Sequence, residues 1–269
     1  MYLRIVHQSL TMIKFKKYQA LGNDYIIINP KDLPNKHILK VEYLCSRNYG
    51  IGSNGILVGP YPSKHANYKL QIFNPDGSEA EISGNGLRIF AQYLKNENIH
   101  TENEFTIELM SRIVHGFYHQ DTVVINMGKV TFPSNKATLK IDNTTLTYIN
   151  VDIGNPHCVV YNQKLDKEYI LKYGPIIENH PLFPNKTNVQ FINIIDRENI
   201  EILIWERGAG YTLASGSSSV ASAASAYHLG LCDESVTVHM PGGKLFISFD
   251  EQFNALMKGK AGKVFEGTL

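Results

Sequence analysis

The stretch that decides the fold is residues 70–94, LQIFNPDGSEAEISGNGLRIFAQYL. It opens on the apolar run 70–73, which predicts a strand, and continues through a loop that contains glycine. After Ser83-Gly84, apolar residues recur at the spacing of one helix face, which predicts a helix. The stretch therefore predicts a unit of strand, glycine-containing loop, Ser-Gly and apolar helix.

A second unit of the same kind lies in the other half of the chain. Residues 202–205 predict a strand, and residues 206–231, ERGAGYTLASGSSSVASAASAYHLGL, contain the loop, the Ser-Gly pair and an alanine-rich helix. Ser83 and Ser215 are 132 residues apart, close to half of the 269-residue chain. We expect an internal duplication of two similar α/β halves. The alternative is two unrelated glycine-rich turns that happen to precede helices.

The rest of the chain predicts mainly strands. Short β-branched or aromatic runs punctuated by glycine, proline and asparagine occur at 25–29, 69–73, 105–109, 123–127, 188–192 and 200–205. Two segments, 87–94 and 219–229, predict helices, and Gly230 fits the C-terminal stop of the second.

Composition excludes several classes of partner. Lys and Arg total 26 against 25 acidic residues, so the near-neutral net charge of +1 argues against a nucleic-acid partner. Apolar runs are far shorter than the ~20 residues that cross a bilayer, so no membrane partner is expected. Residues 1–12 lack the pattern of an export signal, and we expect an N-terminal extension on a cytoplasmic protein.

Three cysteines, Cys45, Cys158 and Cys232, are widely separated and form no CxxC pair. This odd count argues against a disulfide framework and against a structural zinc site. We expect each of them to be a small buried apolar side chain.

The two Ser-Gly turns carry the candidate chemistry. A helix N-terminus has unpaired backbone N–H groups and a partial positive charge, and glycine allows close backbone approach. Two such termini facing each other could hold one carboxylate and place Ser83 and Ser215 on opposite sides of a bound molecule. That geometry suits removing a proton from one face of a carbon and returning it to the other. The alternative is that these turns merely pack.

Seven motifs, taken in order, are specific together. They are Ala20-Leu21-Gly22-Asn23-Asp24-Tyr25, Phe73-Asn74-Pro75-Asp76-Gly77-Ser78-Glu79, Ser83-Gly84-Asn85-Gly86-Leu87-Arg88, Gly154-Asn155-Pro156-His157-Cys158, Asn188-Val189, Glu206-Arg207-Gly208-Ala209-Gly210 and Pro241-Gly242-Gly243. Through them the chain resembles the diaminopimelate epimerase family along nearly its whole length.

The resemblance implies an α+β fold of two pseudo-symmetric halves, each a mostly antiparallel sheet wrapped around a central helix, with the site in the cleft between them. The halves would be 13–127, to which a last strand at 261–269 returns, and 128–260. A homodimer is compatible with the resemblance.

The resemblance also implies an enzyme that converts LL- to meso-diaminopimelate, a precursor of lysine and peptidoglycan, without pyridoxal phosphate, any other cofactor or metal. Its partner would be a small amino-acid substrate, and two opposed side chains would move the α-proton. Asn74, Asn155, Asn188 and Arg207 would hold the distal carboxylate, and Glu206 would hold the distal amino group. Asn23 and the backbone at Gly84, Asn85, Gly216 and Ser217 would address the reacting end. His157 would orient or tune the site.

The sequence departs from the family at the chemistry itself. Ser83 and Ser215 stand where the family has its two catalytic cysteines, and a serine hydroxyl is a far weaker acid than a thiol. Activation would need a partner such as a histidine or carboxylate, and His157 is the motif-associated candidate.

Gly55, Ser218 and Tyr211 also replace the usual glutamine, glycine and acidic residue. This drift favours a natural serine-containing branch over an engineered Cys-to-Ser variant.

Two other functions stay open at this point. One is an isomerase of a related amino or carboxylic acid that uses other acid/base groups. The other is a catalytically inactive protein that binds a diaminopimelate-like compound. Exchange of the substrate α-proton with solvent separates an enzyme from a binding protein, and product chirality separates the two enzymes.

Overall fold

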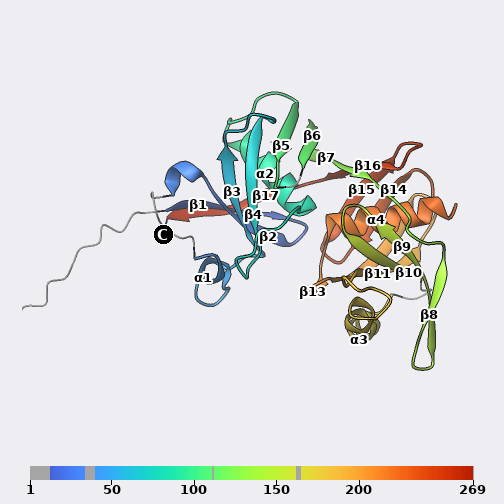
Figure 1. Ribbon diagram of the computed structural model, residues 1–269. Helices are drawn as coiled ribbons and strands as arrows, with labels where there is room; N and C mark the ends of the chain where they lie inside the picture. Colours follow the sequence, from blue (N-terminus) through green and yellow to red (C-terminus); the bar gives the residue numbers. More distant parts are fainter. Residues whose placement is uncertain (1–12, 34–39, 111, 162–164, 269) are drawn as a thin grey trace, which may run out of the picture.

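Two lobes, each a sheet around one helix, make up the protein (Figure 1). The computed structural model describes residues 13–33, 40–110, 112–161 and 165–268. The predicted N-terminal extension 1–12 lies outside the described residues. None of the helices in the described part of the chain is long and apolar enough to cross a membrane.

The N-terminal half is built around α2 (Gly84–Asn96), which contacts strands from both ends of the chain. Its strands are β1 (Lys14–Ala20), β2 (Asn23–Ile28), β3 (Ile56–Tyr61), β4 (Tyr68–Phe73), β5 (Glu104–Glu108), β6 (Ile113–His119), β7 (Thr122–Lys129) and β17 (Gly262–Thr268). A 3-10 turn, η1 (Pro30–Asp32), and the short helix α1 (Val41–Cys45) lie between β2 and β3. Most neighbouring strands are antiparallel, including β17 on β1, whereas β2–β3 and β4–β5 are parallel.

The C-terminal half repeats this plan around α4 (Gly216–His228). Its strands are β8 (Ala137–Ile141), β9 (Thr144–Asp152), β10 (Pro156–Tyr161), β11 (Asn188–Ile194), β12 (Asn199–Glu206), β13 (Gly210–Thr212), β14 (Ser235–Met240), β15 (Gly243–Phe249) and β16 (Asn254–Gly259). Pairs β10–β11 and β12–β14 are parallel and the others antiparallel. A further helix, α3 (Lys167–Glu178), packs on the outer side of β11 and β12.

The predicted fold class is confirmed. All six predicted strand segments are strands, namely β2, β4, β5, β7, β11 and β12, and the two predicted helices are α2 and α4. Gly230 directly follows Leu229, the C-terminal cap of α4. The φ of Gly230 is +69°, a left-handed conformation that favours glycine. The three cysteines are buried and unpaired, as the sequence suggested. Helix α3 was not predicted, because Pro175 lies inside it and Gly174 interrupts its pattern.

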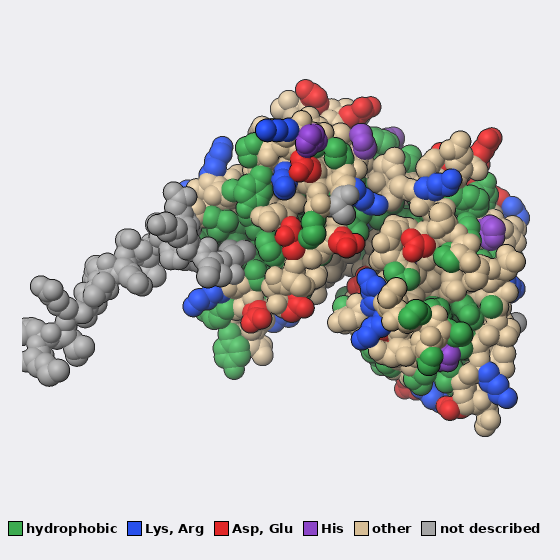
Figure 2. Space-filling view, in the orientation of Figure 1, with side chains coloured by type: hydrophobic (Ala, Val, Ile, Leu, Met, Phe, Trp, Pro, Cys, Tyr) green, Lys and Arg blue, Asp and Glu red, His purple; other side chains and the backbone are tan. Residues whose placement is uncertain are grey.

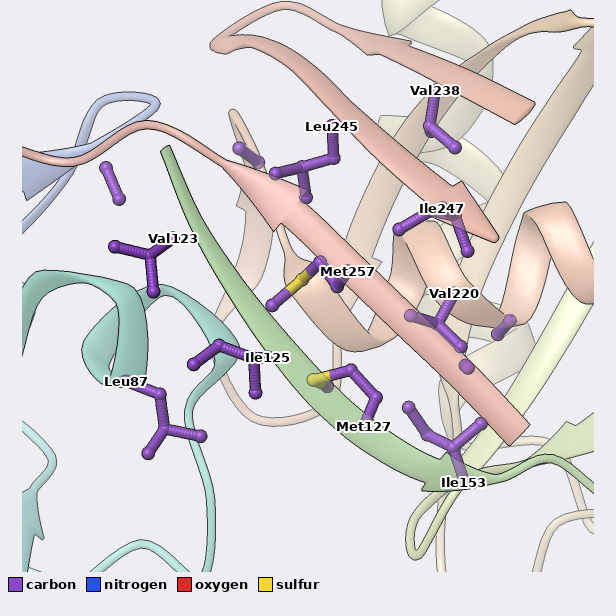
Figure 3. Packing of buried hydrophobic residues seen from close by; sticks show 14 of the residues in the cluster. Leu87, Val123, Ile125, Met127, Ile153, Val220, Val238, Leu245, Ile247 and Met257 are labelled. Carbon is purple, nitrogen blue, oxygen red and sulfur yellow. The ribbon is translucent and has the colours of Figure 1, made fainter. Parts of the chain in front are cut away.

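The halves share one hydrophobic core at their junction. Strand β7 pairs antiparallel with β16, from Val123 opposite Gly259 to Lys129 opposite Asn254. Figure 3 shows the side chains of Met127 and Met257 in this junction, between Leu87 on α2 and Val220 on α4. These residues belong to a single buried cluster, so the two central helices are held by one continuous packed interior.

A second contact joins the two halves. The turn at Leu21 and Gly22, between β1 and β2, lies against Leu213 and Gly242 of the C-terminal half. A Cβ added to Gly242 would lie 2.2 Å from the Leu21 carbonyl oxygen and 3.0 Å from that of Leu213. Gly242 is thus required by close backbone approach between the halves rather than by an unusual φ.

Gly242→Ala is therefore expected to destabilise the protein by about 1–3 kcal/mol, since backbone atoms must shift to admit the methyl group. The free energy of unfolding from urea denaturation measures this. Gly262→Ala in β17 is the control, because its added Cβ would lie 3.9 Å from the nearest atom, the Gln19 side-chain nitrogen. Equal stability of the two variants would show that the halves are not packed in this way.

Candidate active site

The N-termini of the two central helices touch. A Cβ added to Gly216 would lie 3.2 Å from the Gly84 Cα and 2.8 Å from the Met257 sulfur, so only glycine permits this approach. Ser83 and Ser215 are the residues that cap these two helices. Their oxygens accept hydrogen bonds from backbone N–H groups one turn on, Gly86 at 3.0 Å and Ser218 at 3.5 Å.

Polar contacts tie the two turns together. The Asn85 side chain donates to the Ala214 carbonyl at 3.3 Å, which crosses from one half to the other. Behind it, the fully buried Arg88 donates to Asn85 Oδ1 at 2.6 Å and to the Gly84 carbonyl at 3.3 Å. No carboxylate lies within ion-pair distance of Arg88 in the part of the chain that the structure describes, and burial lowers its pKa to about 9. Arg88 stays charged at neutral pH, so the two helix ends and this guanidinium make the region electropositive.

Each capping serine has its own polar neighbour. The Tyr25 hydroxyl lies 3.0 Å from the Ser83 oxygen. The Ser215 hydroxyl lies 3.4 Å from the Ser217 hydroxyl and has the Glu206 carboxyl as a neighbour. Burial raises the pKa of the half-buried Glu206 carboxyl, and the neighbouring hydroxyls of Ser215 and Thr212 oppose that rise. Sequence reasoning did not single out Tyr25, because the contact joins residues 58 positions apart.

The predicted residues of the C-terminal half form one connected group. His157 on β10 stands opposite Asn188 on β11, and the His157 Nε2 lies 3.1 Å from the Asn155 Oδ1. Asn188 accepts from the Arg207 backbone N–H at 3.0 Å and donates to the Pro156 carbonyl at 3.0 Å. The Arg207 side chain is exposed and donates to the Asn185 carbonyl at 3.2 Å. Asn188 thereby fixes the position from which Arg207 projects.

His157 is not placed beside either serine. Its Nε2 is hydrogen-bonded to Asn155, its ring has Gln190 as a neighbour, and its buried Nδ1 has no hydrogen-bond partner among the described residues. Burial lowers the pKa of His157 to about 3, so the ring is neutral at physiological pH. The Gln190 side chain donates a hydrogen bond to the buried Ser218 hydroxyl at 2.9 Å. Ser218, which replaces the usual glycine of the family, therefore has a hydrogen-bond partner.

Asn23 and Asn74 lie on the N-terminal half. Asn23 opens β2 directly after the turn that contacts the C-terminal half. Asn74 is exposed after β4, and its side chain donates to the Ser78 hydroxyl at 3.0 Å within a turn. No hydrogen bond joins either side chain to the other predicted residues in the described ranges.

Residues 15–133 and 149–264 match the family model described as diaminopimelate epimerase. The chain belongs to the diaminopimelate epimerase family. It is 48% identical to diaminopimelate epimerase 2 of Nostoc sp. over 96% of this chain and 95% of that protein. It is 37% identical to a diaminopimelate epimerase of Halothermothrix orenii, over 96% and 98% of the two chains.

Solved structures of distant relatives share the fold of this family member. A hydroxyproline epimerase from Agrobacterium vitis matches with a TM-score of 0.74 at 11% identity, covering 97% of this chain and 93% of that one. A phenazine biosynthesis protein of the PhzF family from Bacillus anthracis matches with a TM-score of 0.72 at 15% identity, covering 96% and 99%.

In this member of the diaminopimelate epimerase family, a notch that is open to solvent separates the two lobes (Figure 2). Contacts between the halves bring family motifs of both together. Leu21 meets Gly242, and Gly84 meets Gly216.

One further residue supports the family's Glu206-Arg207-Gly208 segment. The Glu178 carboxylate, at the C-terminal end of α3, accepts from the Trp205 indole N–H at 2.7 Å and from the Gly208 backbone N–H at 3.0 Å. Glu178 is buried, so it fixes the residues on both sides of Glu206 and Arg207. Sequence reasoning missed it, because neither the helix nor its contact with Trp205 has a local signal.

Glu178→Ala is expected to lower the free energy of unfolding by about 2–3 kcal/mol, because two donors would lose a charged acceptor. Urea denaturation followed by tryptophan fluorescence suits the measurement, since Trp205 is the one tryptophan of the chain. The control is Glu168→Ala at the exposed start of α3, which should change stability by only about 0.5 kcal/mol. If both variants lose the same small amount, Glu178 does not support the segment.

Proposed function

We propose that this chain is a cofactor-independent epimerase that converts LL- to meso-diaminopimelate by two-base transfer of the α-proton. The observation that carries the proposal is the contact between two serine-capped helix N-termini at Gly84 and Gly216. Membership of the diaminopimelate epimerase family supports the substrate, because relatives at 48% and 37% identity carry that enzyme's name.

The paired helix ends are proposed to hold the α-carboxylate. The backbone N–H groups of Gly84, Asn85, Gly216 and Ser217 belong to first turns, where such groups have no partner within the helix. Two positive helix ends and the buried Arg88 favour an anion there. Asn23, which follows the contacting turn, is proposed to address the same end of the substrate.

The distal end of the substrate is proposed to lie against the C-terminal half. Arg207 offers an exposed planar guanidinium, which suits a carboxylate, and Asn155 and Asn74 offer amide groups. Asn188 is proposed to contribute by holding the Arg207 backbone. Glu206 is proposed to bind the distal ammonium group, and its two oxygens leave a further acceptor position for Ser215.

Proton transfer is proposed to run through the two serines. On one face, the Ser215 oxygen takes the α-proton while its own proton passes to the Glu206 carboxylate, so no free alkoxide forms. On the other face, Ser83 gives its proton to the α-carbon, and its oxygen regains a proton from its hydrogen-bonded neighbour. His157, neutral and bonded to Asn155, is proposed to orient the binding group rather than to exchange protons.

We also propose where the enzyme acts and how it assembles. We propose a cytoplasmic homodimer in the supply of lysine and peptidoglycan precursors, whose partner is its small amino-acid substrate rather than nucleic acid or membrane. The net charge of +1 supports the exclusion of nucleic acid. The proposed domains are 13–127 with the last strand 261–269, and 128–260. The pairing of β17 with β1 supports this division.

Incubation with LL- or meso-diaminopimelate in deuterated water is expected to replace the α-proton signal in proton NMR. We expect a slow reaction in the unmodified protein, and faster exchange in the double variant Ser83→Cys/Ser215→Cys. The reason is that a thiol, with a pKa of about 8.5, is a far better proton carrier than a serine hydroxyl.

Ser235→Cys, at the exposed start of β14, controls for a thiol placed elsewhere and should not speed the reaction. Saturable binding without exchange in the unmodified protein, with exchange recovered in the double variant, would identify a diaminopimelate-binding protein that has lost its catalyst. Exchange with a product of unchanged chirality would indicate a different isomerase reaction. Absence of both binding and exchange in every variant would eliminate diaminopimelate as the substrate.

A further inference from the structure

Tyr25, the neighbour of Ser83, packs against Gly55, where no side chain competes with its ring. Tyr25, on β2, is only 7% exposed, and its hydroxyl lies 3.0 Å from the Ser83 oxygen. A Cβ added to Gly55 would lie 2.6 Å from Tyr25 Cε1 and 2.6 Å from the Phe73 carbonyl oxygen. Any side chain at position 55 would therefore displace the ring, so Gly55 and Tyr25 are matched to each other.

Hydrogen-bond counting at Ser83 sets the direction of its proton. A serine hydroxyl accepts two hydrogen bonds and donates one. The Ser83 oxygen accepts from the Gly86 N–H at 3.0 Å. In the contact of 3.0 Å between the two hydroxyls we assign Tyr25 as the donor, because a phenol is a stronger acid than an aliphatic alcohol. Both acceptor positions are then filled, and the Ser83 proton remains free to point at a bound molecule.

We propose that Tyr25 is a proton-relay residue that makes Ser83 a proton donor in the epimerisation. This inference rests on the proposed function. As the Ser83 O–H bond breaks and its proton joins the α-carbon, the Tyr25 proton moves to the Ser83 oxygen. The step leaves a neutral serine and a phenolate on this face and a protonated Glu206 on the other. Epimerisation in the opposite direction, or proton exchange with solvent after product release, restores the phenol and the carboxylate. The Gly86 N–H and the positive end of α2 stabilise negative charge that develops on the Ser83 oxygen.

The surroundings of Tyr25 keep its hydroxyl protonated at neutral pH. Burial, with a smaller contribution from the nearby Glu206, Cys45 and Asp24, raises the pKa of Tyr25 to about 12, against the opposing effect of the Ser83 hydrogen bond. Asp24 is itself paired with two cations, Lys17 at 2.8 Å and Arg47 at 2.7 Å. The phenol is thus protonated throughout the neutral range, as a donor must be. Glu206, which serves Ser215, approaches from the other half, so the two serines have unlike partners.

The test is Tyr25→Phe, made both in the unmodified protein and in the Ser83→Cys background. The ring stays, and the space beside Gly55 stays filled. In the unmodified protein we expect kcat for epimerisation of diaminopimelate to fall by about 10²-fold or more with little change in KM, since a positioned general acid contributes about 10²–10⁴. In the Ser83→Cys background the loss should shrink to a small part of that, because a thiol carries its own ionisable proton.

Tyr118→Phe is the matched control. Tyr118 is a buried tyrosine of the same half, and its hydroxyl donates to the Ala91 carbonyl of α2 at 2.8 Å. A structural role for Tyr25 predicts equal losses in the two backgrounds, and that result would overturn the relay. Activity in the Ser83→Cys background without any in the unmodified protein would overturn it too. Absence of exchange in every variant would instead contradict the proposed function, and the proposed relay would fail for that reason.

Discussion

The contact between Gly84 and Gly216 is the constraint on which the rest of the structure depends. Two helices that meet end to end at their N-termini place like partial charges against each other, which is unfavourable unless packing enforces it. The shared core at the junction holds the two helix ends together, because Met257 packs against both glycines and β7 pairs with β16. Because each glycine lacks a side chain, the two turns approach closely enough to act on one bound molecule.

An electropositive junction of this kind favours an anionic ligand. The buried Arg88 adds a full charge to the two helix ends, and its contacts to Asn85 and Gly84 keep the turn of α2 rigid. Burying an arginine without a carboxylate partner is costly, and such costs are tolerated mainly where function needs them.

The pseudo-symmetry of the fold does not extend to the chemistry of its two serines. Ser83 has a phenol beside it and accepts a well-formed bond from its own helix, whereas Ser215 has a carboxyl beside it and a longer bond of 3.5 Å. A phenol that stays protonated at neutral pH can supply a proton, and a carboxylate can take one.

The sequence by itself determined the strands, the two central helices and the Ser-Gly turns. These follow from local rules, such as the apolar period of 87–94 and the left-handed preference of Gly230. It also determined the family, because motifs in a fixed order are specific together. Only the tertiary structure decided that Tyr25 rather than His157 neighbours a serine, and that Glu178 supports the segment around Arg207. Those contacts join residues 58 and 30 positions apart, and no local preference encodes them, since they depend on how the buried sheets and helices pack.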